Sequence, residues 1–237
     1  MFNQHDGEPR RTRVKVCGIT CPEDALLCAE LGADALGFNF YPRSARYLDP
    51  AGTSQDWMRD LPQGVRRVGV FVNAPLEEIT ALLRRGLIDS VQLHGDEDEN
   101  FCAQIHDSGV PFAKAIRVRD ASSLVAPERF RTGDLLLDAY RADAYGGTGH
   151  QLDWLLAADF AAQQGKIGRR IILSGGLNPE NIAQAVARVR PFAVDVASGV
   201  ELPGNPRCKN EARLRDFIAA VRTADQQAIA RVNTRPV

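Results

Sequence analysis

Val14-Lys15-Val16-Cys17-Gly18-Ile19-Thr20 is a short apolar run that ends in Cys-Gly and leads into a helix start. Similar runs recur along the chain, most of them 21 to 23 residues apart and two separated by 33 and 36 residues. They are almost continuously apolar, which is typical of parallel strands buried on both faces. We therefore expect strands at Val14–Cys17, Ala35–Phe40, Val68–Val72, Ser90–His94, Phe112–Ile116, Leu135–Asp138, Ile171–Ser174 and Ala193–Val196.

Helix signals fill the gaps between these runs. Thr20-Cys21-Pro22-Glu23 fits a capping box, and Asn178-Pro179-Glu180 places a cap and then a proline at the first helical position. Leu76 to Arg85 predicts a further helix closed by Gly86, and Glu211 to Val221 predicts the last one. Eight units of one strand and one helix favour an α/β fold of the closed (β/α)8 type, the TIM barrel, over a doubly wound sheet.

Nothing in the sequence divides the chain into separate domains. No Ser/Gly-rich linker and no shift in composition appears, so we expect one domain. The length of 237 residues is usual for a single barrel of this type. The predicted barrel spans residues 13–222, after a flexible polar extension over 1–12 and before a helix extension or tail over 223–237.

Charge and composition exclude several classes of partner. Lys and Arg number 29 against 30 Asp and Glu, so no net field attracts nucleic acid or an anionic membrane. No apolar stretch approaches the roughly 18 residues that span a bilayer, and the polar N-terminus lacks a signal core, which indicates a cytoplasmic protein. Five cysteines, an odd number, argue for reduced thiols. No interface patch is readable in the sequence, so it identifies no protein partner. A small-molecule ligand is expected from the reactive side chains at the strand ends.

Two reactive side chains stand at predicted strand ends. Cys17 ends the first strand and Asp138 the sixth, and barrels of this type place their chemistry at that end of the strands. A thiol and a carboxyl group there can serve as a base and an acid. Lys15 faces the same side as Cys17, and Asp195 is the only charge in the eighth strand. Strands one and eight are neighbours in a closed barrel, so we predict that Lys15 and Asp195 pair beneath Cys17.

Glycine turns after strands seven and eight predict a phosphate site. Ser174-Gly175-Gly176-Leu177 and Ala197-Ser198-Gly199-Val200 let backbone N–H groups approach an anion, and barrels often bind phosphate at these two loops. A third cluster, Tyr145–Gly149, lacks the Lys-Ser/Thr pair of a nucleotide P-loop and indicates a mobile loop near the ligand.

A metal site is not expected. Cys17, Cys21 and His94 lack the paired spacing of metal ligands. His94 ends the fourth strand, where it either lines the pocket or is a hydrogen-bonded structural histidine; the sequence leaves both readings open.

Eight stretches, one in each strand–helix unit, together resemble the phosphoribosylanthranilate isomerase family. The resemblance covers roughly residues 13 to 220 and implies an Amadori rearrangement in tryptophan biosynthesis, without a cofactor. It implies that Cys17 is the base, Asp138 the acid and Arg46 the cation for the anthranilate carboxylate, with phosphate bound near Gly175, Gly176, Ser198 and Gly199. The stretches are Val14–Thr20, Gly37–Tyr47, Val68–Asn73, Val91–Gly95, Leu136–Asp138, Tyr145–Gly149, Ser174–Asn181 and Val194–Glu201.

The sequence departs from the family pattern at three places, and two other functions compete with the implied one. Ala197 replaces a common serine, His150 a common lysine, and Asn205–Asn210 alters a Pro-Gly-Lys-Lys-Asp turn. One competitor is another phosphate-binding barrel enzyme, such as a ribulose-phosphate epimerase, which would use a cluster of His and Asp around a metal. The other is a non-catalytic barrel, which would have no reason to keep both the thiol and the carboxyl group.

Overall fold

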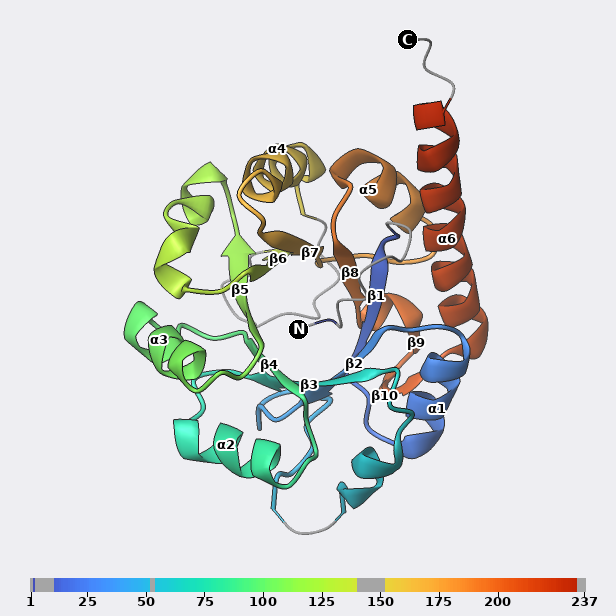
Figure 1. The fold of residues 1–237 in the computed structure, drawn as a ribbon. Helices are drawn as coiled ribbons and strands as arrows, with labels where there is room; N and C mark the ends of the chain where they lie inside the picture. Colours follow the sequence, from blue (N-terminus) through green and yellow to red (C-terminus); the bar gives the residue numbers. More distant parts are fainter. Residues whose placement is uncertain (1, 3–10, 52–53, 140–151, 234–237) are drawn as a thin grey trace.

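Eight parallel strands close into a barrel in the computed structural model, in the order β1 to β8, with β8 hydrogen-bonded back to β1 (Figure 1). The structure describes residues 2, 11–51, 54–139 and 152–233. All eight predicted strands are confirmed, each within two residues of its expected bounds. They are β1 (Arg13–Cys17), β2 (Ala35–Asn39), β3 (Arg66–Phe71), β4 (Ser90–Leu93), β5 (Phe112–Val118), β6 (Asp134–Ala139), β7 (Arg170–Leu173) and β8 (Ala193–Val196).

Helices surround the ring, but the expectation of one α-helix per unit was wrong. In the described part of the chain, the β2–β3 and β5–β6 connections hold only the 3-10 helices η1 (Asp56–Asp60), η2 (Ala121–Leu124) and η3 (Pro127–Phe130). Both connections contain proline, and the residue before a proline disfavours the α-helical conformation. Ala126, directly before Pro127, has a φ of +52°. The α-helices are α1 (Pro22–Glu30), α2 (Leu76–Arg84), α3 (Glu99–Asp107), α4 (Trp154–Gly165), α5 (Ile182–Val189) and α6 (Glu211–Asn233).

Two predicted helix starts differ in detail. The hydroxyl of Thr20 does not cap α1; it donates to the backbone carbonyl of Arg207 at 2.7 Å, so a tertiary contact replaces the capping box. Helix α5 begins at Ile182, later than expected. Before it, Asn178 and Asn181 each accept the other's backbone N–H, at 3.0 and 2.9 Å, and close a turn that delays the helix.

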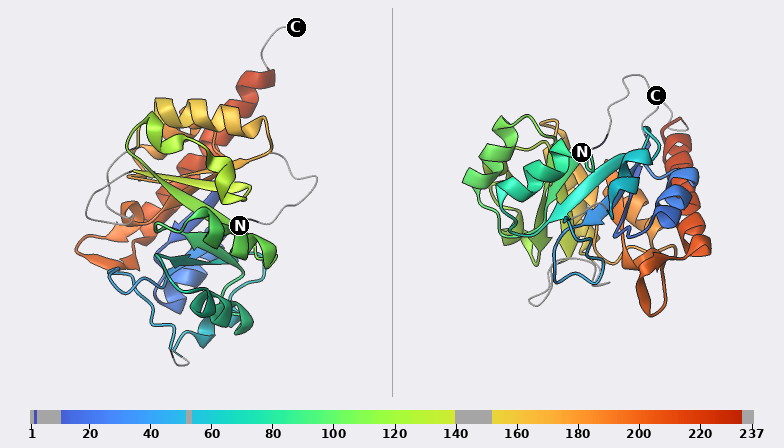
Figure 2. Two further views of the ribbon diagram at one scale, coloured as in Figure 1. Left: turned by 90° about the vertical axis from the view of Figure 1, so that its left-hand side faces the viewer. Right: turned by 90° about the horizontal axis from the view of Figure 1, so that it is seen from below.

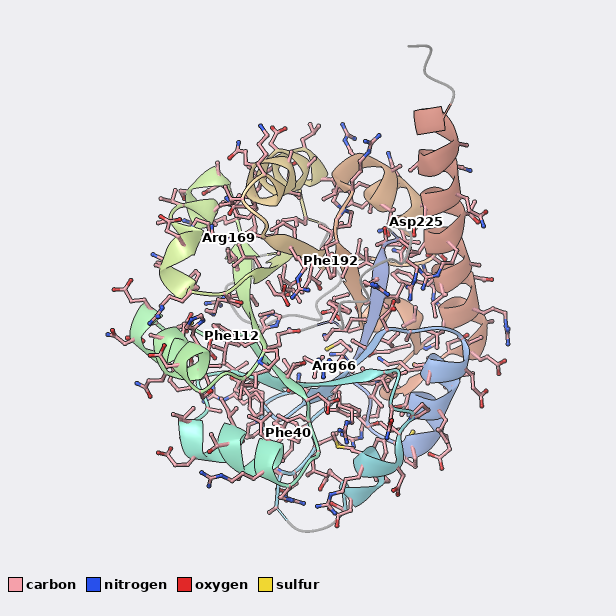
Figure 3. All side chains as sticks on the ribbon, in the orientation of Figure 1. Phe40, Arg66, Phe112, Arg169, Phe192 and Asp225 are labelled. Carbon is pink, nitrogen blue, oxygen red and sulfur yellow. The ribbon has the colours of Figure 1, made fainter. Side chains whose placement is uncertain are left out.

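The N-terminal end of the barrel is closed by apolar contacts. Phe2 is 4% exposed, and its ring meets that of Phe192 edge-on with the centroids 5.7 Å apart; Phe192 is labelled in Figure 3. The side chains around Phe2 are mostly small, so one aromatic ring fills the space between them. The expected flexible extension lies largely outside the described residues. The buried residues of this cluster are Phe2, Ala35, Val68, Ala113, Ala115, Leu136, Ile172 and Ala193.

Polar contacts fasten neighbouring elements at the same end. Arg170 at the start of β7 makes two hydrogen bonds to Asp134 at the start of β6, at 2.5 and 2.9 Å. On α6, Asp225 accepts from the backbone N–H and hydroxyl of Thr12 at 2.9 and 2.7 Å, and Figure 3 labels this aspartate beside β1. Helix α6 continues to Asn233, so the described part of the segment after residue 222 is a helix extension, one of the two alternatives that the sequence left open.

A short antiparallel hairpin projects from the other end of the barrel (Figure 2, right). It consists of β9 (Glu201–Leu202) and β10 (Asn205–Lys209) and was expected only as a turn. Arg207 in β10 donates through Nη1 to the carbonyls of Ala45 and Tyr47, at 3.4 and 3.0 Å. The hairpin therefore holds the loop that follows β2.

None of the helices in the described ranges is both long enough and apolar enough to cross a membrane.

Candidate active site

Lys15 and Asp195 form an ion pair inside the barrel, as predicted. Lys15 Nζ donates to Asp195 Oδ1 at 2.7 Å, and their side chains are 0% and 6% exposed. The two residues lie opposite each other in the β1–β8 register. Their pairing follows from strand alternation and from the closure of the ring.

Cys17 lies directly above this pair. A Cβ atom added to Gly37 of β2 would come within 2.7 Å of Cys17 Sγ and 3.0 Å of Lys15 Nζ, so both groups rest over that glycine. Burial raises the pKa of Cys17, and Asp195 raises it further, while Lys15 and Lys209 lower it; the pKa remains above its ordinary value. The ammonium groups of Lys15 and Lys209 favour the thiolate, against burial and the charge of Asp195.

Asp138 sits at the end of β6, 3% exposed, within a chain of hydrogen bonds. Its Oδ1 accepts from the backbone N–H of Ala139 at 2.9 Å, and its Oδ2 lies 3.2 Å from His94 Nε2. His94 Nδ1 in turn lies 2.7 Å from Gln92 Nε2. An amide N–H donated to Nδ1 leaves the proton of neutral His94 on Nε2, facing Asp138. His94 therefore contacts the proposed acid.

Arg46 lies over the backbone that follows Cys17. A Cβ on Gly18 would come within 2.2 Å of Arg46 Cδ, and the φ of Gly18 is +80°, so glycine is required there. Arg46 also makes a two-bond ion pair with Glu201, which the sequence analysis missed: Nε to Oε1 at 2.6 Å and Nη2 to Oε2 at 2.7 Å. Burial lowers the pKa of Arg46, but the hydrogen bond and charge of Glu201 outweigh it and raise the pKa.

Lys209 of β10 is a second residue that the sequence analysis missed. Its Nζ donates to Glu201 Oε1 at 3.0 Å and to the backbone carbonyl of Cys17 at 2.7 Å, and its side chain is fully buried. Burial alone raises the pKa of Glu201, but the hydrogen bond from Arg46 and the charges of Lys209 and Arg46 hold it below its ordinary value. Glu201 is therefore a carboxylate between two cations.

The glycine loops after β7 and β8 lie against Asp138 and against each other. Gly175 has a φ of +86°, and a Cβ there would lie 2.7 Å from the backbone nitrogen of Ala139 and 3.1 Å from Asp138 Oδ1. A Cβ on Gly199 would lie 2.0 Å from the carbonyl oxygen of Leu177.

The backbone around these glycines can receive an anion. Among the described residues, the N–H groups of Gly175 and Gly176 donate to no backbone carbonyl, and Gly176 has a φ of +68°. Ser198 begins the 3-10 helix η4 (Ser198–Val200) directly after β8. Arg213 of α6 ties the two loops together, since it donates to the carbonyl of Gly199 and pairs with Glu180.

The structure thus brings a thiol, a carboxyl group, an arginine and two glycine loops to one end of the barrel. Such a set can move protons on a ligand that carries a phosphate and a carboxylate. Within the described ranges no group of three or more His, Cys, Asp or Glu could hold a metal ion, and all five cysteines are free. The predicted mobile loop at Tyr145–Gly149 and His150 lie outside the described residues.

Comparison with known proteins gives one consistent result. The family model described as N-(5'phosphoribosyl)anthranilate (PRA) isomerase matches residues 14–220. A relative named N-(5'-phosphoribosyl)anthranilate isomerase from Citrifermentans bemidjiense is 46% identical over 208 residues, which cover 88% of this chain and 96% of that protein.

Solved structures agree with this result. The phosphoribosyl anthranilate isomerase from Thermotoga maritima superposes with a TM-score of 0.80 at 39% identity, covering 90% of this chain and 99% of that one. A phosphoribosyl anthranilate isomerase in complex with reduced 1-(o-carboxyphenylamino)-1-deoxyribulose 5-phosphate superposes with a TM-score of 0.77, also at 39% identity and with the same coverage.

Proposed function

Because the chain belongs to the N-(5'-phosphoribosyl)anthranilate isomerase family, we propose that Cys17 and Asp138 are the base and the acid of its reaction. The enzyme is an isomerase of tryptophan biosynthesis. It converts N-(5-phosphoribosyl)anthranilate into 1-(2-carboxyphenylamino)-1-deoxyribulose 5-phosphate. One observation supports these roles above all: the thiol of Cys17 and the carboxyl group of Asp138 stand at the same end of the barrel. Arg46 and the two glycine loops lie at that end as well.

The substrate has two anionic groups, and the site offers a place for each. We place the phosphate on the backbone N–H groups around Gly175, Gly176, Ser198 and Gly199, where an anion meets fixed donors. We place the aromatic carboxylate on Arg46, whose planar guanidinium can bind both oxygens of a carboxylate. The ribose then lies between the two anchors, beside Asp138 and Cys17.

The reaction requires two proton transfers. Asp138 donates a proton to the ribose ring oxygen, the C1′–O bond breaks, and the nitrogen lone pair forms an iminium. The resulting carboxylate of Asp138 accepts from His94 Nε2–H and from the N–H of Ala139, which stabilises its charge.

Cys17 completes the conversion. Its thiolate removes the C2′ proton, the electrons form the enolamine, and tautomerisation gives the ketose. C2′ is oxidised from an alcohol to a ketone while C1′ is reduced, so the electrons balance within the substrate and the steps need no external oxidant, reductant or cofactor. We also propose that the enzyme acts in the cytoplasm, where a thiol base stays reduced.

The decay of anthranilate fluorescence tests these roles. Cys17→Ser and Asp138→Asn should each lower kcat by about 10²–10⁴-fold, the usual contribution of a positioned acid or base, with the circular dichroism spectrum unchanged. Cys102→Ser is the matched control, because it also changes a buried thiol but lies on α3. Wild-type turnover in either site variant would remove that residue from its role. A wild-type protein that binds the substrate without converting it would favour the non-catalytic barrel.

A further inference from the structure

The substrate-binding arginine is itself held in a defined orientation. Glu201 binds the Nε and Nη2 edge of Arg46, at 2.6 and 2.7 Å, and the two side chains are only 13% and 6% exposed. Besides the two N–H groups that bind Glu201, the guanidinium has two N–H groups on Nη1 and one more on Nη2. The pairing with Glu201 therefore leaves the end of the fork available for a second carboxylate.

Lys209 links this pair to the proposed base. Its fully buried ammonium group bridges Glu201 Oε1 and the carbonyl oxygen of Cys17. The connected groups run from the backbone of Cys17 through Lys209 and Glu201 to Arg46. Each contact between these groups is a charge-assisted hydrogen bond, which is stronger than a hydrogen bond between neutral groups.

The charges of Lys209, Glu201 and Arg46 together favour the binding of an additional anion. One carboxylate, that of Glu201, lies between the ammonium group of Lys209 and the guanidinium of Arg46. The three groups together carry one surplus positive charge in a partly desolvated place. An incoming aromatic carboxylate neutralises that charge without displacing Glu201, because the two carboxylates use different edges of the guanidinium.

We propose that Glu201 is a positioning residue that orients Arg46 toward the substrate carboxylate and, through Lys209, fixes that anchor relative to Cys17. This inference rests on the proposed function. A carboxylate bound equally in the ground state and the transition state changes KM, whereas misplacing the reacting carbon changes kcat. Glu201 therefore acts mainly on KM, because its side chain contacts Arg46 and neither of the proton-transferring groups.

The test measures kcat and KM with N-(5-phosphoribosyl)anthranilate for the wild type, Glu201→Gln, Arg46→Met and the double variant. Glu201→Gln should raise KM by about 10–100-fold with a smaller change in kcat, because an amide cannot accept both guanidinium hydrogen bonds. In the Arg46→Met background the same change should have almost no further effect, since residues that act through one another are not additive.

A substrate without the carboxylate separates positioning from general damage. N-(5-phosphoribosyl)aniline, prepared from aniline and ribose 5-phosphate, should show the same KM with wild type and Glu201→Gln. Asp134→Asn is the matched control: it breaks an arginine pair of the same Nε and Nη2 type at the opposite end of the barrel, and it should leave KM for both substrates unchanged.

A second variant keeps the test decisive if Glu201→Gln does not fold. Glu201→Asp keeps the charge but withdraws the carboxylate by one methylene, and should raise KM for the carboxylate substrate to a lesser extent. Folded Glu201 variants with wild-type KM, or effects that simply add to those of Arg46→Met, would overturn the positioning role. An inactive wild-type protein would instead refute the proposed function, so the two failures are distinguishable.

Discussion

Lys15 gives Cys17 the strongest positive neighbour in the site. Its own pKa is lowered by burial, but the charges of Asp195 and Cys17 outweigh that effect and raise it. Lys15 therefore stays protonated where the thiolate needs a counter-charge. The ion pair that keeps Lys15 protonated joins two residues that are 180 positions apart in the sequence.

Lys15→Met should move the pH dependence of the enzyme upward. Burial already raises the pKa of Cys17, and Lys15 opposes that rise, so removing the ammonium group raises the pKa further. Activity that depends on the thiolate increases with pH, and in the variant this increase should begin at a pH about 1–3 units higher. The measurement is kcat/KM against pH, alongside the pH dependence of iodoacetamide labelling at Cys17.

Lys15→Arg is the control for this prediction. It keeps the charge beside Cys17 and Asp195, so its pH profile should lie closer to that of the wild type. A profile in Lys15→Met that matches the wild type would mean that Lys15 does not set the ionisation of the thiol.

Residues differed in how far the sequence could place them. The Lys15–Asp195 pair was predictable because strand alternation and ring closure leave the two side chains only one place to meet. The partnership of Arg46 with Glu201 was not, because both residues follow strand ends and their contact depends on loop conformations. A charged pair, Glu201 and Lys209, on either side of a turn was the only available signal, and it also fits an ordinary surface hairpin.

Strands were predicted more closely than helices, and the cause is physical. A strand buried on both faces must be apolar along its length, so its bounds are visible in the sequence. A connection on the outside of the barrel can be an α-helix or irregular, and the described parts of the β2–β3 and β5–β6 connections, which contain prolines, hold only 3-10 helices. The hairpin β9–β10 was missed because its strands are short and half-exposed.

The loops after β7 and β8 depend on Gly199 for their close approach. Gly199→Ala would place a methyl group 2.0 Å from the carbonyl oxygen of Leu177, and two backbone segments cannot both keep their positions. We expect KM to rise by about 10–100-fold, since a displacement of about 1 Å can cost ~10²-fold, and inhibition by inorganic phosphate to weaken in parallel. Kinetics with and without added phosphate would measure both effects.

Gly64→Ala is the matched control, because a Cβ at Gly64 meets nothing within 4 Å. It should leave KM and phosphate inhibition at wild-type values. Unchanged phosphate inhibition in Gly199→Ala would show that these two loops do not bind the phosphate.

On the scale of the whole molecule, the two ends of the barrel have different tasks. The end with Cys17 and Asp138 holds the chemistry, and the other end holds arginine–aspartate pairs and the apolar cluster around Phe2. The contacts at this second end stabilise the fold and take no part in the reaction. The burial of Phe2 was not predicted, because the sequence that follows it is polar.

Phe2→Ala should destabilise the protein without changing its chemistry. The substitution empties the space among small side chains next to Phe192, and losing a buried aromatic ring costs up to about 3–5 kcal/mol. Urea unfolding should show a lower midpoint, while kcat and KM stay at wild-type values.

Phe2→Leu should recover most of that stability, because it keeps an apolar side chain of useful size. An unchanged midpoint in Phe2→Ala would show that the aromatic ring contributes nothing to the closure.

The pairing of β1 with β8 has a consequence for the biosynthesis of the enzyme. Asp195, Lys209 and Asp225 contact Lys15, Cys17 and Thr12, yet a ribosome makes them 180 to 213 residues later than these partners. The nascent polypeptide therefore carries its thiol without its electrostatic environment until β8 and β10 have left the exit tunnel. Catalytic competence arrives in one late event, and a product of premature termination before β8 is inert.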